Sequence, residues 1–218
     1  MVAPPELGLR ALQKLERRRR IEHAAREIFH EKGYEAATTR EIAARAGVSI
    51  GTLFAYVVEK RDLLTMLFRD DMRALTEQTF ASIPQDIPFF EQLIFVFKAR
   101  YNFWQKDQAL ARHAVRESTI DIHRPDGPRS PSDDNAPPQF LLQHKLLKLV
   151  EENRRRGHLS REHDAEIITR LILDIYLNES RMWIAQPSPE VSSGIERLRG
   201  VLELALQSVI RKPRRKHQ

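Results

Sequence analysis

Ser49 is the residue whose neighbours come closest to a catalytic pattern, because Gly47-Val48-Ser49-Ile50-Gly51 has the G-x-S-x-G spacing of the nucleophile in α/β-hydrolases. In those enzymes the serine lies on a strained turn between a buried strand and a helix, beside an oxyanion hole. The residues before Ser49 have a helical pattern, and no series of strands is predicted that could build the sheet. We therefore interpret Ser49 as a helix cap and predict no catalytic residue and no enzyme activity.

Metal chemistry has little support in the sequence. The eight histidines are scattered, and His158 and His163 are five residues apart, which does not place them on one face of a helix. His113, His123 and His144 could meet only if the tertiary fold brings them together. The chain has no cysteine, so thiolate ligands, thiol nucleophiles and disulfides are all excluded. We expect ordinary histidines, no metal site and no cofactor.

The elements that position these residues are predicted to be helices. Apolar residues recur at spacings of three and four, for example at Ile21, Ala24 and Ile28, and no alternating stretch is long enough to be a strand. Prolines are absent from residues 6–83 and crowd the segment 125–138, which we expect to be a long loop. The sequence therefore predicts an all-α fold of about nine helices.

Composition narrows the class of protein further. The chain has 218 residues, 41% of them hydrophobic, so it can bury a core. Its longest apolar run, residues 93–97, is far shorter than the ~20 residues of a membrane-spanning helix. No secretory signal is visible and cysteine is absent, so we expect a cytoplasmic protein with no membrane partner. The net charge of +6 is compatible with a nucleic-acid partner.

The most informative segment is residues 38–57. Thr38 and Glu41 have the spacing of a capping box, in which a hydroxyl and a carboxylate accept from free backbone N–H groups at the start of a helix. Gly47 can end that helix because glycine adopts positive φ at little cost, and Ser49 can cap the next one. Two short helices joined by a turn of three to four residues that contains glycine form a helix-turn-helix.

A helix-turn-helix binds duplex DNA by laying its second helix in the major groove, where outward side chains meet base edges. Thr52 can donate to or accept from a base, and Gly51 allows close approach of the backbone. Ile50 or Ala55 can touch a thymine methyl group. Residues at the starts of the neighbouring helices would hold flanking phosphates. The predicted DNA-binding residues are Thr38, Arg40, Ser49, Ile50, Gly51, Thr52, Ala55, Tyr56 and Lys60.

Residues 18–64 resemble the DNA-binding domain of the tetracycline-repressor (TetR/AcrR) family. The resemblance rests on residue types at fixed offsets, from Ile21 through Gly33 and the segment 38–53 to Lys60 and Leu64. It implies a homodimeric transcriptional regulator, usually a repressor, that binds a palindromic operator in double-stranded DNA. It also implies a small-molecule effector, of unknown identity, that binds the C-terminal helical domain and changes the spacing of the two DNA-reading heads.

The chain departs from the usual pattern of that family in the second helix of the motif. Many members have a basic residue where this chain has Ile50, a tyrosine where it has Phe54 and another aromatic residue where it has Ala55. Because Phe54 has no hydroxyl for a phosphate, we assign more of the DNA contact to Tyr56, Thr52 and Ser49. Phe54 and Tyr56 could instead both be packing residues.

The C-terminal region must pair the subunits if the resemblance holds. Aliphatic stripes on the last two helices, predicted over residues 160–183 and 190–210, suit a four-helix contact across a two-fold axis. The same stripes also serve the core of the subunit itself. The predicted dimer-interface residues are Ile168, Leu171, Ile172, Ile175, Leu198, Leu202, Ala205 and Val209.

An aromatic segment at residues 89–104 is the best candidate for the wall of an effector pocket, because it is apolar on more than one helical face. Aromatic stripes are more often plain core. A polar side chain facing the cavity, His113 or Arg116, would favour an anionic or hydrogen-bonding effector over a plain hydrophobic one. The predicted ligand-binding residues are Phe97, Tyr101, Trp104, His113, Arg116, Phe140 and Tyr176.

The chain is therefore predicted to contain a three-helix DNA-binding domain and a larger helical domain. The expected parts are an N-terminal extension at 1–17, a helix-turn-helix domain at 18–58, an effector and dimerisation domain at 59–210 and a basic tail at 211–218. The effector would favour a head spacing that cannot reach two half-sites about 34 Å apart. The alternative is a DNA-associated adaptor without a small-molecule pocket.

Overall fold

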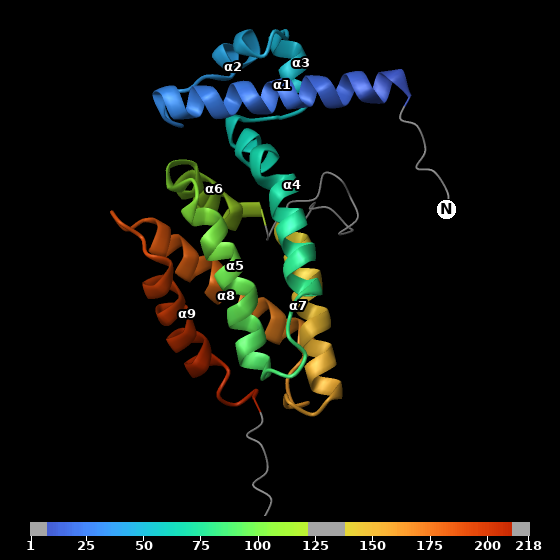
Figure 1. Ribbon diagram of the computed structural model, residues 1–218, viewed down its shortest axis with the longest axis vertical. Helices are drawn as coiled ribbons and strands as arrows, with labels where there is room; N and C mark the ends of the chain where they lie inside the picture. The colour runs from blue at the N-terminus through green and yellow to red at the C-terminus, as the bar shows by residue number, and fades with distance from the viewer. Residues whose placement is uncertain (1–7, 122–137, 211–218) are drawn as a thin grey trace, which may run out of the picture. The chain divides into compact units, whose positions relative to one another are not determined.

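The computed structural model describes residues 8–121 and 138–210, which form nine helices and one isolated bridge, as the all-α prediction requires (Figure 1). The chain divides into two compact units, Met1–Phe68 and Arg69–Gln218. The division falls within α4 (Lys60–Ala81), whereas the predicted boundary precedes that helix. The predicted basic tail and the proline-rich segment up to residue 137 lie outside the described residues.

The first unit consists of α1 (Leu9–Lys32), α2 (Thr39–Arg45), α3 (Ile50–Phe54) and the first turns of α4. α1 packs against α2, and α2 packs against α3. Burial on α1 begins at Ile21, so residues 9–17 of the predicted extension form exposed helix. The core of this unit includes Ile21, Ala24, Ala25, Ile28, Phe29, Ile42, Ala43, Leu53 and Val57.

The second unit continues α4 and adds α5 (Phe89–Gln105), α6 (Gln108–Asp121), α7 (Pro138–Arg155), α8 (Ala165–Ile184) and α9 (Val191–Ala205). α8 is central because it packs against α5, α6, α7 and α9, and α5 also runs beside α9 (Figure 1). The largest fully buried side chains of this unit come from α5 and α8. They are Phe97, Tyr101, Tyr176 and Trp183.

Close packing of α9 on this aromatic core depends on Gly194. A Cβ atom at position 194 would lie 2.5 Å from Cε1 of Tyr101 and 2.7 Å from Cδ1 of Trp183, much closer than van der Waals contact allows. The absence of a side chain therefore lets the backbone of α9 reach the two rings.

α8 and α9 are shorter than the helices predicted over residues 160–183 and 190–210. The backbone N–H of Ser160 donates to the carbonyl of Val209 at 2.8 Å, next to the antiparallel bridge between Leu159 and Ile210. Residues 160–164 and 206–210 are therefore not part of α8 and α9. Asp164 then caps α8, where its carboxylate accepts from two free backbone N–H groups. The bridge joins residues far apart in sequence and leaves no local signal.

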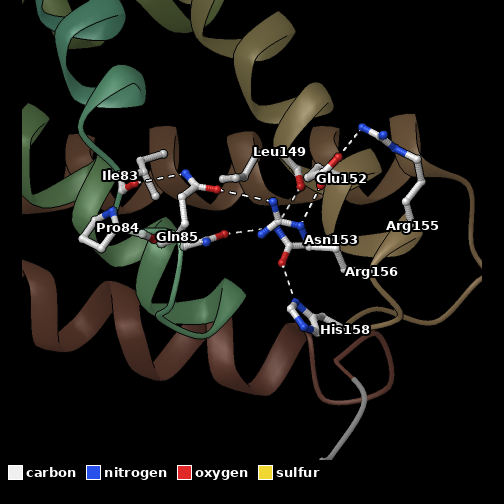
Figure 2. Close-up of polar contacts among 10 residues, drawn as sticks. Ile83, Pro84, Gln85, Leu149, Glu152, Asn153, Arg155, Arg156 and His158 are labelled. Atoms are coloured by element: carbon white, nitrogen blue, oxygen red, sulfur yellow. Dashed lines mark hydrogen bonds and ion pairs between the residues drawn. The ribbon is translucent and has the colours of Figure 1, made fainter.

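A buried polar network joins α5 to α7 and to the segments that follow α4 and α7 (Figure 2). The amide nitrogen of Asn153 donates to Oε1 of Gln92 and to the carbonyl of Leu149, both at 3.0 Å. Its amide oxygen lies 3.0 Å from Nδ1 of His158, and Gln92 donates to the carbonyl of Pro84 at 3.4 Å. Both polar atoms of this buried asparagine are hydrogen-bonded, as burial requires.

Residues 8–121 and 138–210 contain neither a membrane-spanning helix nor a cluster of metal ligands. None of their helices has the length and apolar character needed to cross a membrane. No group of three or more His, Asp or Glu side chains within them is arranged to hold a metal ion.

Candidate nucleic-acid interface and effector site

The start of α2 has the predicted capping box. The Thr38 hydroxyl accepts from the backbone N–H of Glu41 at 3.2 Å, and the Glu41 carboxylate accepts from the backbone N–H of Thr38 at 3.1 Å. The ammonium of Lys32 also donates to Glu41. Lys32 and then Thr38 hold the pKa of Glu41 below its ordinary value. The start of α2 is thereby fixed to the end of α1.

The turn between α2 and α3 depends on Gly47, whose φ is +63°. The backbone N–H of Val48 reaches back to the carbonyl of Ala43 at 3.0 Å, which closes α2. Ser49 then caps α3, because its hydroxyl accepts from the backbone N–H of Thr52 at 3.0 Å. The serine of the G-x-S-x-G pattern therefore has the capping role that the sequence predicts.

The outward face of α3 consists of small and apolar side chains. Ile50 is 41% exposed and Phe54 is 49% exposed, and Gly51 and Ala55 are exposed beside them. Leu53 points the other way and is fully buried. Phe54 is therefore not a core residue, and it extends the face that can contact thymine methyl groups.

Thr52 and Tyr56 have hydrogen-bond partners inside the first unit. The hydroxyl of Thr52 lies 2.8 Å from that of Ser49 at the start of α3. The hydroxyl of Tyr56 donates to the carbonyl of Lys14 at 3.1 Å, which ties the segment after α3 to the exposed part of α1. Both side chains are half-buried, so each retains some surface for a DNA contact.

Lys60 has a structural role that the sequence analysis missed. Its ammonium donates to the carbonyls of Tyr34, Glu35 and Ala37 at 2.9, 3.1 and 3.2 Å and lies 4.6 Å from the centroid of the Tyr34 ring. A lysine ammonium has only three protons to donate. The geometry therefore does not support the phosphate contact predicted for Lys60, because all three protons are directed at the chain between α1 and α2.

Arg40 differs from the other arginine near the motif. Arg45 donates to the carboxylate of Glu31 at 2.8 and 2.9 Å, which raises the pKa of Arg45 and lowers that of Glu31. Arg40 is exposed on α2 and has no ion pair or hydrogen bond to another residue that the structure describes. Its guanidinium is therefore available for a phosphate.

Four of the predicted ligand-binding residues lie together in the core of the second unit. The rings of Phe97 and Tyr176 stack with centroids 4.6 Å apart, and Tyr101 meets Tyr176 edge-on at 6.2 Å. The indole of Trp104 donates to the Tyr176 hydroxyl at 3.3 Å. All four side chains are buried, and burial raises the pKa of Tyr101 above its ordinary value. We call these four residues the aromatic cluster.

The other three predicted ligand-binding residues are placed differently. Phe140 is on α7 and lines an open groove beside α8 together with His144 and Thr169. On α6, His113 is half-buried and Arg116 is exposed. Exposed Arg116 is therefore not the polar group of the buried aromatic cluster.

The polar group of the aromatic cluster is Arg100, which the sequence analysis missed. The Nε of Arg100 donates to the Tyr176 hydroxyl at 3.1 Å from a side chain that is 5% exposed. Its signal in the sequence is a single cation on a helical face that otherwise carries the aromatic residues Phe97, Tyr101 and Trp104.

The sequence matches the family of bacterial regulatory proteins described as the tetR family, over residues 21–67. The matched residues begin at the first buried position of α1, include all of α2 and α3, and end in α4. The chain belongs to the TetR family. It is a DNA-binding transcriptional regulator, and its helix-turn-helix is the one described above.

Similarity to known regulators extends beyond the DNA-binding helices. The fatty acid metabolism regulator protein of Bacillus subtilis is 29% identical over 115 residues, which are 51% of this chain and 59% of that protein. The transcriptional repressor KstR of Mycobacterium tuberculosis is 26% identical over 188 residues, 85% of this chain and 78% of KstR. The TetR-family repressor FadR of Thermus thermophilus, solved with lauroyl-CoA, has the same fold, with a TM-score of 0.67 at 23% identity over 92% of this chain and 100% of FadR.

Most of the predicted dimer-interface residues of this TetR-family chain are core residues of one subunit. A side chain packed inside its own subunit has little surface left for a partner. The five residues with at most 4% exposure are Ile168, Ile172, Leu198, Leu202 and Val209.

The remaining three predicted interface residues retain surface, since Leu171 is exposed and Ile175 and Ala205 are half-buried. Helical periodicity identifies the apolar stripe but not which edge of it faces solvent. The exposed apolar side chains on α8 and α9 are Ile167, Leu171, Met182, Val201 and Leu204.

Proposed function

We propose that this TetR-family regulator is a repressor that leaves its operator when a small molecule binds the second unit. The exposed face of α3, with Ile50, Gly51 and Ala55 at its surface, is the observation that carries the proposal. A short helix with small outward residues can enter the major groove closely. The Ser49 hydroxyl accepts from the backbone of Thr52, which speaks against a nucleophilic serine.

In the proposed complex, α3 reads base edges while Thr38 and Arg40 at the start of α2 hold phosphates. Phosphate contacts fix the register of the protein on the duplex, and base contacts give the sequence preference. Two copies of the chain would bind half-sites about 34 Å apart, one turn of DNA. The operator is therefore expected to be a palindrome.

The proposal is tested by selecting fragments of the host genome that bind the purified protein and measuring affinity for the enriched sequence. Thr52→Ala should weaken operator binding by about 10-fold or more, since one base contact is worth ~1–3 kcal/mol. Thr52→Ser keeps the hydroxyl and is the matched control. Equal operator affinity of Thr52→Ala and the unchanged protein, with both folded, would remove α3 from the reading surface.

The relatives support an effector with an extended apolar body. One relative is named for fatty acid metabolism, and FadR was solved with lauroyl-CoA. In this chain the aromatic cluster places apolar side chains of α5 and α8 in the core of the second unit. Release of the labelled operator on addition of lauroyl-CoA, but not of coenzyme A alone, would support an acyl effector.

A DNA-binding adaptor without an effector is the second candidate, and the packing of the aromatic cluster favours it. Phe97 is fully buried against Tyr176, so these rings fill space that a ligand would need. The adaptor predicts that no small molecule changes operator affinity. An effector predicts that the rings move apart when it binds.

A further inference from the structure

Arg100 is a buried cation without a carboxylate partner. Its Nε donates to the Tyr176 hydroxyl at 3.1 Å and one terminal nitrogen donates to the Thr76 hydroxyl at 3.2 Å, and both acceptors are neutral. The guanidinium carbon lies 5.5 Å from the centroid of the Tyr176 ring. No residue within the described ranges forms an ion pair with it. An unpaired charge at this depth is strongly unfavourable unless something compensates it.

The hydrogen-bonding groups around Arg100 are short of an acceptor. The Thr76 hydroxyl donates its own proton to the carbonyl of Met72 at 2.7 Å. The Tyr176 hydroxyl accepts from both Arg100 and Trp104, so its own proton is available, and no side chain or carbonyl in the described part of the chain accepts it. The remaining N–H groups of the guanidinium fork are available as well. Within the described residues, therefore, no carboxylate oxygen accepts a hydrogen bond from Arg100 or from the Tyr176 hydroxyl.

We propose that Arg100 and the Tyr176 hydroxyl bind the carboxylate of an apolar organic acid. This proposal rests on the ligand-responsive function proposed above and names the acidic end of the effector. A guanidinium fork matches the two oxygens of a carboxylate, and a tyrosine O–H adds a third donor. The single charge of Arg100 balances one negative charge, which favours a carboxylate over a phosphate dianion. The rings of Phe97 and Trp104 lie beside these donors and would contact the apolar body once the stacked rings of Phe97 and Tyr176 move apart to admit it.

The test compares ligands that share a body and differ in the charged end. Laurate, lauramide, dodecyl phosphate and lauroyl-CoA are titrated into the full-length protein by calorimetry, together with 4-phenylbutyrate and its amide. A charged hydrogen bond in a buried site makes a carboxylate bind about 10- to 100-fold more tightly than the matched amide. Operator affinity is measured in parallel with each ligand.

Three variants separate ligand binding from a structural role of the arginine. Arg100→Met should abolish the preference for acid over amide without lowering the unfolding temperature of the ligand-free protein, because it removes an unpaired buried charge. Tyr176→Phe keeps the ring and should lose part of the preference. Arg112→Met is the matched control, since exposed Arg112 donates to the carbonyl of Gln186 at 2.9 Å on the surface, and it should behave as the unchanged protein.

The proposal is overturned if no carboxylate binds more tightly than its amide, or if Arg100→Met keeps the preference. Tighter binding of dodecyl phosphate than of laurate would reassign the site to phosphate and overturn the carboxylate. A lower unfolding temperature of ligand-free Arg100→Met, with the acid preference intact in Tyr176→Phe, would make Arg100 a structural residue. Operator release by acid and amide alike would overturn the carboxylate and leave the ligand-responsive function standing, whereas absence of operator binding would overturn that function itself.

Discussion

Lys60 and Arg40 are both cations next to the helix-turn-helix, and the structure gives them different partners. The three carbonyls bound by Lys60 would lose their donor in Lys60→Met, so the free energy of unfolding should fall by about 1–3 kcal/mol. The slope of the logarithm of operator affinity against the logarithm of salt concentration should not change. Urea unfolding and salt titrations of operator binding measure the two quantities.

Arg40→Met is the matched comparison and should give the opposite pattern. Arg40 has no partner among the residues that the structure describes, so its loss should leave the free energy of unfolding unchanged. One phosphate contact fewer should make the salt slope shallower by about one unit for each subunit bound. If Lys60→Met flattens the slope while Arg40→Met does not, the two assignments must be exchanged.

At the level of single residues, the sequence predicts what depends on close neighbours. Thr38 and Ser49 cap their helices through residues three positions away, so their roles follow from spacing alone. The partners of Lys60 lie in the segment between α1 and α2, and those of Arg100 lie on α4 and α8, so no local pattern predicts them. The same limit explains why Arg116, one of the two polar groups expected at the effector site, is exposed while Arg100 is buried.

At the level of the helix, α9 contains two glycines with opposite surroundings. Gly194→Ala should destabilise the second unit by about 1–3 kcal/mol, because its Cβ would collide with Tyr101 and Trp183. Gly200 has no atom within 4 Å of the equivalent position and is exposed, so Gly200→Ala should stabilise α9 by about 0.5–1 kcal/mol. Denaturant unfolding of the two variants measures both effects. Stabilisation by both substitutions would mean that α9 does not pack closely on these rings.

A second prediction at this level concerns the ion pair that links α5 to α9. Arg199 donates to both carboxylate oxygens of Glu91 at 2.7 and 2.9 Å, which lowers the pKa of Glu91 in the folded protein. A lowered folded pKa means that the charged carboxylate favours the folded state. Its contribution is therefore complete above the unfolded pKa and is lost as the pH falls through the folded pKa.

Glu91→Gln should accordingly lower the free energy of unfolding at pH 7 by no more than about 1 kcal/mol, since the pair is partly exposed. The difference from the unchanged protein should shrink as the pH falls below 4.5, the ordinary pKa of a glutamate. Glu203→Gln is the control, because Glu203 meets Arg199 only at 4.0 Å within the same helix. A gap that persists or widens in acid would contradict the ion pair.

The elements themselves were largely predictable, and the exceptions have a common cause. The apolar spacing predicts the stripes that α1, α5, α8 and α9 bury, but no stripe is predicted for α6, which buries Leu110 and Val115. The start of α4 at Lys60 also agrees with the spacing. The start of α8 does not, because Ser160 pairs with Val209 instead of opening a helix. Likewise, the stripe on α8 and α9 predicts apolar residues at Ile168 and Leu198 but not that they face the core of the same subunit.

At the level of the whole molecule, dimerisation is proposed to use the exposed edge of those stripes. Leu204 is 71% exposed on α9, so Leu204→Glu should place a charge in the contact between subunits and yield a folded monomer with weak operator binding. Leu9→Glu is the matched control, because Leu9 is 73% exposed on α1. Sedimentation analysis measures the mass in each case, and a dimer of unchanged stability in Leu204→Glu would exclude this edge of α9 from the contact.

The only two tryptophans of the chain, Trp104 and Trp183, both belong to the second unit, and both are buried beside tyrosine rings. Indole fluorescence therefore reports on the second unit and not on the DNA-reading helices, whereas far-ultraviolet circular dichroism detects the helices of both units. Comparing the two signals in one melting experiment shows whether the units unfold together, since coincident curves are the signature of a single cooperative transition. Tryptophan fluorescence of the unmodified protein therefore follows the unfolding of the second unit, which is proposed to bind the effector.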